Sequence, residues 1–149
     1  MPTYREAKIR DLLTIVDFQL AMARETEGIE LDLYVCTRGV EAVFEDRNLG
    51  RYFIAEEGER IVGSLLITPE WSDWRNGLVW WIQSVYVIPE FRGRGVYAGL
   101  YKFVQTLAGN TELVKGIRLY VDRRNTTAQE VYRRLGMNGD HYLVFEWMK

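Results

Sequence analysis

Apolar residues recur along the chain at two spacings, one typical of helices and one typical of strands. Helical spacing follows Asp11, a plausible N-cap, until Gly28 interrupts it, and a second helix is expected from Asp32 towards Phe44. Runs of β-branched and aromatic residues predict strands. The expected strands are residues 3–9, 52–56, 61–68, 78–88, 117–122 and 141–147, and the expected later helices are residues 95–108 and 125–135.

The order of these elements predicts the fold class. The turn Glu57-Gly58-Glu59 joins two strands into an antiparallel hairpin, and the loop 71–77 leads into a long apolar run that is typical of a central strand buried on both faces. A helix then connects this run to the next strand. We therefore expect an α+β fold with a mixed, mostly antiparallel central sheet flanked by helices, in one domain over residues 1–149.

Composition narrows the class of protein. A chain of 149 residues with 48% hydrophobic residues can bury one core. It has no apolar run of about 20 residues and no apolar stretch at its start, so we expect a cytoplasmic protein with no membrane partner. Its one cysteine, Cys36, and one histidine, His141, argue against a disulfide, a zinc site and Cys-His catalysis. We expect no metal.

Charge is distributed unevenly along the sequence. Residues 1–91 carry 9 basic and 16 acidic residues, whereas residues 92–134 carry 9 basic and 3 acidic residues. This asymmetry suggests an anion bound by the later segment and a cation attracted to the earlier one. An ordinary solvated surface would give the same counts, and charge alone does not separate the two interpretations.

The segment from Val85 to Ala98 carries the clearest local motif, because a buried strand leads through glycines into a helix start. Unpaired amides at a helix N-terminus bind phosphate, and Arg92 and Arg94 add suitable donors. A tight turn with exposed arginines is the structural alternative. The Walker A sequence is absent. A dinucleotide pattern, Gly93-x-Gly95-x-x-Ala98, is present, but the expected antiparallel hairpin and the short chain argue against a nicotinamide-binding fold.

These residues resemble the acetyl-CoA loop of the GNAT superfamily of N-acetyltransferases, Q/R-x-x-G-x-G/A preceded by V-x-P. The match falls on Arg92-Gly93-Arg94-Gly95-Val96-Tyr97, with Val87 and Pro89 before it, and Tyr97 stands where the family usually has glycine or alanine. A second similarity follows the next expected strand. There the family's asparagine, alanine, tyrosine, glycine and hydrophobic positions fall on Asn125, Ala128, Tyr132, Gly136 and Met137.

The resemblance implies a GNAT-like fold, acetyl-CoA as cosubstrate and direct transfer of the acetyl group to a primary amine. It implies that the backbone amide of Val85 or Tyr86 holds the thioester carbonyl and that Tyr132 protonates the departing thiolate. The implied cofactor-binding residues are Val85, Tyr86, Val87, Arg92, Gly93, Arg94, Gly95, Val96, Tyr97, Asn125 and Tyr132. Taken without the resemblance, Tyr132 is better explained as a core aromatic and Asn125 as a turn residue or helix cap.

The general base is harder to assign, because Trp81 stands where some family members carry a glutamate and Gln83 cannot accept a proton. The stretch Glu25–Asp32 contains four acids, lies where the family builds its acceptor site, and suggests Glu27 as the base. A solvated helix end is the alternative. Expected partners are a small-molecule or peptide amine and, through exposed tryptophans such as Trp71, a second copy in a homodimer, but not nucleic acid.

Two other functions stay open at this point. Tyr97 and Trp81 are compatible with a non-catalytic sensor or binding module for acyl-CoA, and the glycine pattern is compatible with a nicotinamide-dinucleotide-binding protein.

Overall fold

The computed structural model describes residues 1–149, which divide into two compact units, Met1–Arg118 and Leu119–Lys149. The first unit contains a 5-stranded sheet in the order β1-β2-β3-β4-β5. Its elements are β1 (Thr3–Glu6), η1 (Ile9–Asp11), α1 (Leu12–Glu27), α2 (Leu33–Glu45), β2 (Arg51–Glu57), β3 (Arg60–Ser72), β4 (Gly77–Val87), η2 (Pro89–Phe91), α3 (Val96–Gly109) and β5 (Val114–Arg118). The second unit contains α4 (Thr126–Arg134).

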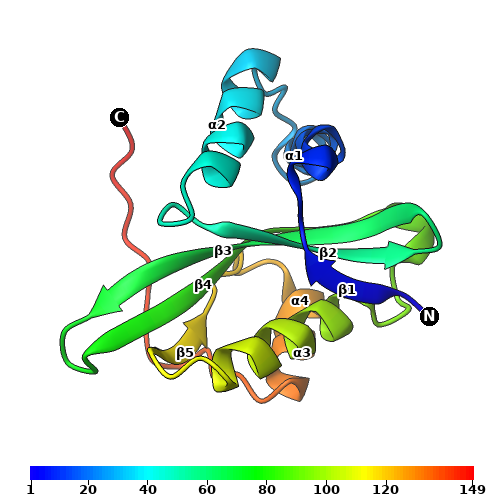
Figure 1. The fold of residues 1–149 in the computed structure, drawn as a ribbon. Helices are drawn as coiled ribbons and strands as arrows, with labels where there is room; N and C mark the ends of the chain where they lie inside the picture. The colour runs from blue at the N-terminus through cyan, green and yellow to red at the C-terminus, as the bar shows by residue number, and fades with distance from the viewer. The chain divides into compact units, whose positions relative to one another are not determined.

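Strand pairing in the first unit gives a mixed sheet. β1 to β4 pair antiparallel with their sequence neighbours, and β5 pairs parallel with β4 after the crossover through α3. Helices α1 and α2 lie over one face of the sheet and α3 lies over the opposite face (Figure 1). The predicted α+β class with a mostly antiparallel central sheet is confirmed.

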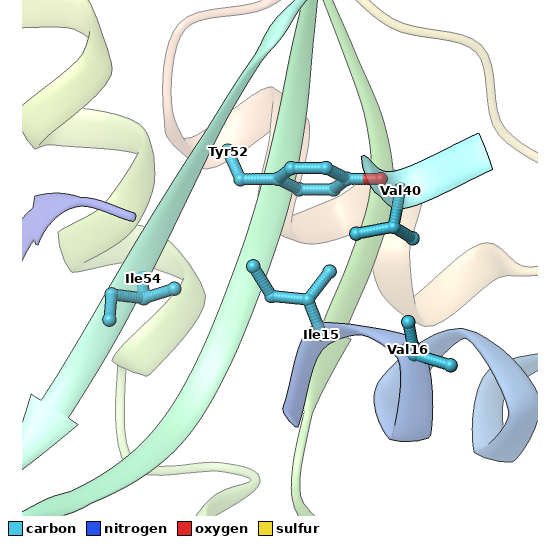
Figure 2. Close-up of a cluster of buried hydrophobic side chains, with 5 residues drawn as sticks. All are labelled: Ile15, Val16, Val40, Tyr52 and Ile54. Carbon is cyan, nitrogen blue, oxygen red and sulfur yellow. The ribbon is translucent and has the colours of Figure 1, made fainter. Parts of the chain in front are cut away.

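The alternation of side chains along β2 explains why the sheet is covered on both faces. Tyr52 and Ile54 pack with α1 and α2 in a buried cluster, in which the Tyr52 ring reaches towards Val40 (Figure 2). Phe53, which points the other way, lies 6.0 Å from the ring of Phe103 in α3. Both faces of β2 are therefore apolar, as expected for a strand between two layers of helix.

The ends of the first two helices follow their sequence signals. Gly28 ends α1 in the left-handed conformation, at φ 64°. Asp32 begins α2 as an N-cap, because its carboxylate accepts a hydrogen bond of 2.9 Å from the Val35 amide. The predicted boundaries of both helices are confirmed to within one residue.

Several predicted strand boundaries are wrong. The first strand ends at Glu6, and β3 and β4 extend into both ends of the expected loop, because Ser72 pairs with Gly77. β5 begins at Val114, earlier than expected, and residues 119–122 form no strand. The position of β5 is determined by its pairing with β4 rather than by the local run of apolar residues.

The predicted strand over residues 141–147 is also wrong, since residues 137–149 form no helix or strand. Aromatic and branched residues favour strands only where the backbone pairs with a neighbour, and this segment has no such pairing. Large side chains such as Phe145 and Trp147 are consequently exposed, at 93% and 86%.

None of the helices is both long enough and apolar enough to cross a membrane. Cytoplasmic location and a homodimer stay predictions.

A polar cluster joins β1 and β2 to the start of α1. The Arg5 guanidinium donates hydrogen bonds to the buried Asp11 carboxylate, at 2.8 Å, and to Glu56, at 3.2 Å. The Lys8 amide donates a further bond of 2.8 Å to Asp11. Burial alone would raise the pKa of Asp11, but the bonds from Arg5 and Lys8 outweigh it and lower the pKa below the ordinary value.

We expect Asp11→Asn to lower the free energy of unfolding at pH 7 by about 2 kcal/mol, because it removes a charge from a buried hydrogen-bonded pair. The folded pKa of Asp11 is depressed, so its contribution is present above the unfolded value of about 3.9 and is lost as pH falls through the folded value. The gap between variant and wild type, measured by urea unfolding, should therefore narrow in acid. Glu57→Gln, at an exposed ion pair, is the control and should change stability by no more than about 0.5 kcal/mol.

Candidate active site

The central strand β4 contains an irregularity beside its last residues. Ser64 pairs with Tyr86 and Leu66 pairs with Gln83, so Ser84 and Val85 both lie opposite Leu65. This is a β-bulge, and Ser84 adopts a left-handed conformation at φ 52°, which is rare for a residue with a Cβ. Strained backbone of this kind in a central strand is typical of functional sites.

Beyond the bulge, one edge of β4 has no neighbouring strand. β5 pairs only with Leu78–Trp81, so residues 82–87 are unpaired on that side. The Ile88 amide donates to Val62 on the β3 side, at 3.0 Å. Because the direction of the amide alternates along a regular strand, the amide of Val87 points to the open edge. The bulge interrupts this alternation at Ser84 and Val85. The Val87 amide can donate to a ligand that lies along the edge.

The strand then leads into α3 through a glycine turn. Gly93 and Gly95 adopt left-handed conformations, at φ 74° and 77°, and a Cβ at either position would meet nothing within 4 Å. Gly95 is the N-cap of α3, and no side chain caps the first amides of the helix. These amides and the positive end of the helix dipole form an anion site with open space in front of it.

Tyr97, the departure from the family pattern, lies within the first turn of α3. Its ring packs beside Tyr101 one turn further along, with ring centroids 6.4 Å apart. The side chain therefore extends along the helix rather than across the glycine turn, and the backbone of the turn keeps the conformation that the motif requires.

The two arginines of the motif have different roles. Arg94 stacks over Phe91, 5.0 Å from the ring centroid, and forms no ion pair. Arg92 donates from Nε to the Val87 carbonyl at 2.8 Å and from Nη2 to Glu25 at 2.8 Å. Arg94 is thus available to an anion at the helix start, whereas Arg92 connects the open edge of β4 to the end of α1.

Glu25 is the acid of the early stretch that contacts the central strand. Its carboxylate accepts a hydrogen bond of 3.3 Å from the Tyr86 hydroxyl as well as the bonds from Arg92. Burial, and to a smaller extent the charge of Glu25, raises the pKa of Tyr86 above 10.0. Glu27 is exposed and makes no hydrogen bond or ion pair. Sequence reasoning found this acidic stretch but selected the other glutamate.

Several polar side chains of β3, β4 and β5 interact on the surface of the sheet. Trp81 donates from its indole nitrogen to Glu70 at 2.9 Å, and Glu70 also pairs with Arg118 at 3.3 Å. Gln83 donates from its amide to Thr68. Glu70 could not be identified as a neighbour of Trp81 from the sequence, because their proximity depends on the register between β3 and β4.

The remaining predicted site residues, Asn125 and Tyr132, belong to the second unit. Asn125 is the N-cap of α4, since its side-chain oxygen accepts a hydrogen bond of 3.1 Å from the Ala128 amide. The Gln129 side-chain amide donates to the carbonyls of Asp122 and Arg123 just before this helix. Burial raises the pKa of Tyr132 above 10.0, so its hydroxyl is protonated at neutral pH.

The fold and the glycine turn define the class of protein, an acetyltransferase. The model of the acetyltransferase (GNAT) family matches residues 15–137, and the chain belongs to that family. No curated protein sequence matches the chain. The mixed, mostly antiparallel sheet of this chain is not that of a doubly wound nicotinamide-binding fold.

Solved structures agree with this assignment. A possible acetyltransferase from Clostridium difficile 630 is 39% identical and superimposes with a TM-score of 0.92, covering 100% of this chain and 98% of that one. A predicted acetyltransferase with acetyl-CoA from Clostridium acetobutylicum is 24% identical, with a TM-score of 0.76 and coverage of 98% and 96%. AAC(6')-Iy in complex with a CoA bisubstrate analogue is 18% identical, with a TM-score of 0.78 and coverage of 100% and 99%. The last two similarities show the fold alone.

We expect the backbone at the bulge to limit which residues Ser84 can be replaced by. Ser84→Val should lower the free energy of unfolding by about 1 to 2 kcal/mol, because a β-branched residue is strained in the left-handed region. Ser84→Gly should stay within about 0.5 kcal/mol of wild type, since relief of strain offsets the added freedom of the unfolded chain. Chemical unfolding measures both, and equal stabilities for the two variants would contradict the left-handed conformation.

Proposed function

We propose that the protein is an N-acetyltransferase that moves the acetyl group of acetyl-CoA directly to a primary amine. The observation that carries this proposal is the continuity of three features: the bulge of β4, its open edge, and the uncapped start of α3. One extended ligand that has amides in its middle and a diphosphate at one end would match all three.

The residues of the first unit fit such a donor substrate. The amides at the start of α3 would bind the diphosphate, with Arg94 beside them. The open edge of β4 would pair with the amide-containing arm, and Val85 would hold the thioester oxygen. One such donor contributes on the order of 3 kcal/mol to the stability of the transition state. The bound acetyl-CoA named for the Clostridium acetobutylicum protein supports this donor.

The transfer requires one bond to form and one to break. The neutral amine attacks the thioester carbon, the carbon–nitrogen bond forms, and the carbon–sulfur bond then breaks with its electron pair left on sulfur. Tyr132 gives its proton to that thiolate. A partly buried phenol with a raised pKa keeps this proton at neutral pH until the thiolate is formed.

The proton of the attacking amine needs a base, and we assign this role to Glu25. Tyr86 follows Val85 directly in β4, and its hydroxyl donates to the Glu25 carboxylate at 3.3 Å. In this proposal the acceptor amine binds within reach of that hydroxyl. The amine proton passes to the Tyr86 oxygen as the hydroxyl proton passes to Glu25. The acidic character of residues 1–91 favours a positively charged acceptor, either a small molecule or a peptide N-terminus.

Tyr132→Phe should leave the Kd for acetyl-CoA unchanged and lower kcat about 10² to 10⁴-fold, because only the proton donor is lost. Release of CoA thiol with a panel of amines measures kcat, and calorimetry measures the Kd. Turnover equal to wild type would remove Tyr132 from the mechanism. Tight binding of acetyl-CoA by the wild type with no thiol release for any amine would instead support a non-catalytic sensor.

Glu25→Gln and Glu27→Gln form a matched pair that locates the base. The first should lower kcat/KM about tenfold or more, because the group that receives the amine proton is lost, whereas the second should stay close to wild type. Melting temperatures of both variants check that the fold is intact. The opposite ranking would return the assignment to Glu27.

A further inference from the structure

A cavity lies between α1, α2 and β2, away from the glycine turn. Its volume is about 290 Å³, and its walls are mainly apolar. The residues that line it include Gln19 of α1, Val35, Cys36, Gly39 and Val40 of α2, and Tyr52 of β2. Two of these residues, Val40 and Tyr52, also belong to the buried cluster drawn in Figure 2. A cavity of this size holds a chain of several carbon atoms.

One polar group in the wall has no partner. Gln19 is only 8% exposed, and its side-chain nitrogen, Nε2, makes no hydrogen bond. A buried amide donor without an acceptor destabilises a folded protein, and such groups are rare. Gln19 therefore points to a ligand that brings an acceptor oxygen into the cavity.

The other polar groups of the wall are uncharged or already engaged. Burial raises the pKa of Tyr52 to about 12 and also raises the pKa of the Cys36 thiol, so both are neutral near pH 7. The Asp32 carboxylate at the rim accepts the Val35 amide as a helix cap. This cavity suits an apolar group with a neutral oxygen rather than a second ion.

The register of the sheet relates this cavity to the bulge. Tyr52 pairs with Leu66, and Leu66 pairs with Gln83, the residue before Ser84. Paired residues share a face of the sheet, so the cavity and the Gln83 side chain lie on the same face. Two strand spacings separate them, about 10 Å. A ligand of that length can reach from the cavity to the bulge.

We infer that this cavity binds the far end of the acceptor amine, an apolar group with an uncharged carbonyl or hydroxyl oxygen, and that Gln19 selects that oxygen. The inference rests on the proposed acetyl transfer and specifies the class of acceptor. The acceptor is then an elongated amphipathic amine with its oxygen about 10 Å from the reacting nitrogen.

Two amines of similar length test this selection: 6-aminohexanamide, which carries a terminal carbonyl, and hexylamine, which does not. Wild-type protein should show a kcat/KM about tenfold higher for 6-aminohexanamide, because hexylamine leaves Gln19 unpaired. Gln19→Met should reduce that ratio to about one through KM and should raise the melting temperature, since an unpaired buried donor is removed. A residue with only a structural role would lower the melting temperature and leave the ratio unchanged.

Gly39→Leu tests the cavity by filling it. A Cβ at Gly39 meets nothing within 4 Å, so the variant should fold, and the KM for both amines should rise about tenfold with kcat unchanged. Gly109→Leu, at the end of α3 where a Cβ also meets nothing, is the control and should keep the wild-type KM. Unchanged KM values and an unchanged substrate ratio in both cavity variants would overturn the inference, even if acetyl transfer were established.

Binding of hexanamide, which has no amine to acetylate, separates this inference from the proposed function. Hexanamide should raise the melting temperature of wild-type protein but not of Gln19→Met or Gly39→Leu. That result together with no turnover of any amine would support the cavity as a ligand site and reject acetyl transfer. No stabilisation of the wild type would count against the cavity.

Discussion

The short pairing between β4 and β5 is the constraint on which the candidate active site depends. The backbone groups of a central strand are normally hydrogen-bonded on both sides. Beyond Trp81, β4 has no neighbouring strand on the β5 side. The bulge at Ser84 follows within a few residues, and the glycine turn begins where the strand ends. Unpaired amides, a displaced backbone and an uncapped helix therefore lie in sequence along one edge, where an amide-bearing ligand can complete the hydrogen bonds that the sheet leaves unmade.

Arg92 connects this edge of β4 to helix α1. Its guanidinium contacts the Val87 carbonyl, the Tyr86 ring at 5.4 Å and the Glu25 carboxylate. Half-exposed ion pairs contribute little to stability, so the consequence of this contact is mainly positional. Sequence reasoning assigned Arg92 to phosphate binding. In the structure it holds the end of α1 against β4, the strand that contains the bulge.

The sequence was sufficient for local features and insufficient for those that depend on pairing. Gly28, Gly93 and Gly95 act through their own backbone, and Asp32 acts through a hydrogen bond to an amide three residues away. Their roles as helix end, turn and cap could therefore be predicted. The partners of Glu25 and Glu70 depend on strand register and on how α1 lies over the sheet, which no local pattern encodes. The same limitation explains the wrong strand at residues 141–147, where strand-forming residues have no neighbour to pair with.

The tryptophan at position 81 changes which part of the fold supplies a carboxylate. An indole only donates a hydrogen bond, so Trp81 binds the carboxylate of Glu70, which Arg118 also neutralises. The Glu70 carboxylate on the sheet is consequently already paired. The acid that contacts β4 beyond the bulge is Glu25, which belongs to α1. Because the same helix carries Gln19, its placement controls the positions of both the proposed base and the proposed acceptor cavity. That placement depends on Asp11 and Arg5 at its start and on the packing of Phe18 against Tyr86, with ring centroids 5.0 Å apart. The positions of Glu25 and Gln19 are therefore coupled to helix packing, whereas the open edge and the bulge depend on the sheet.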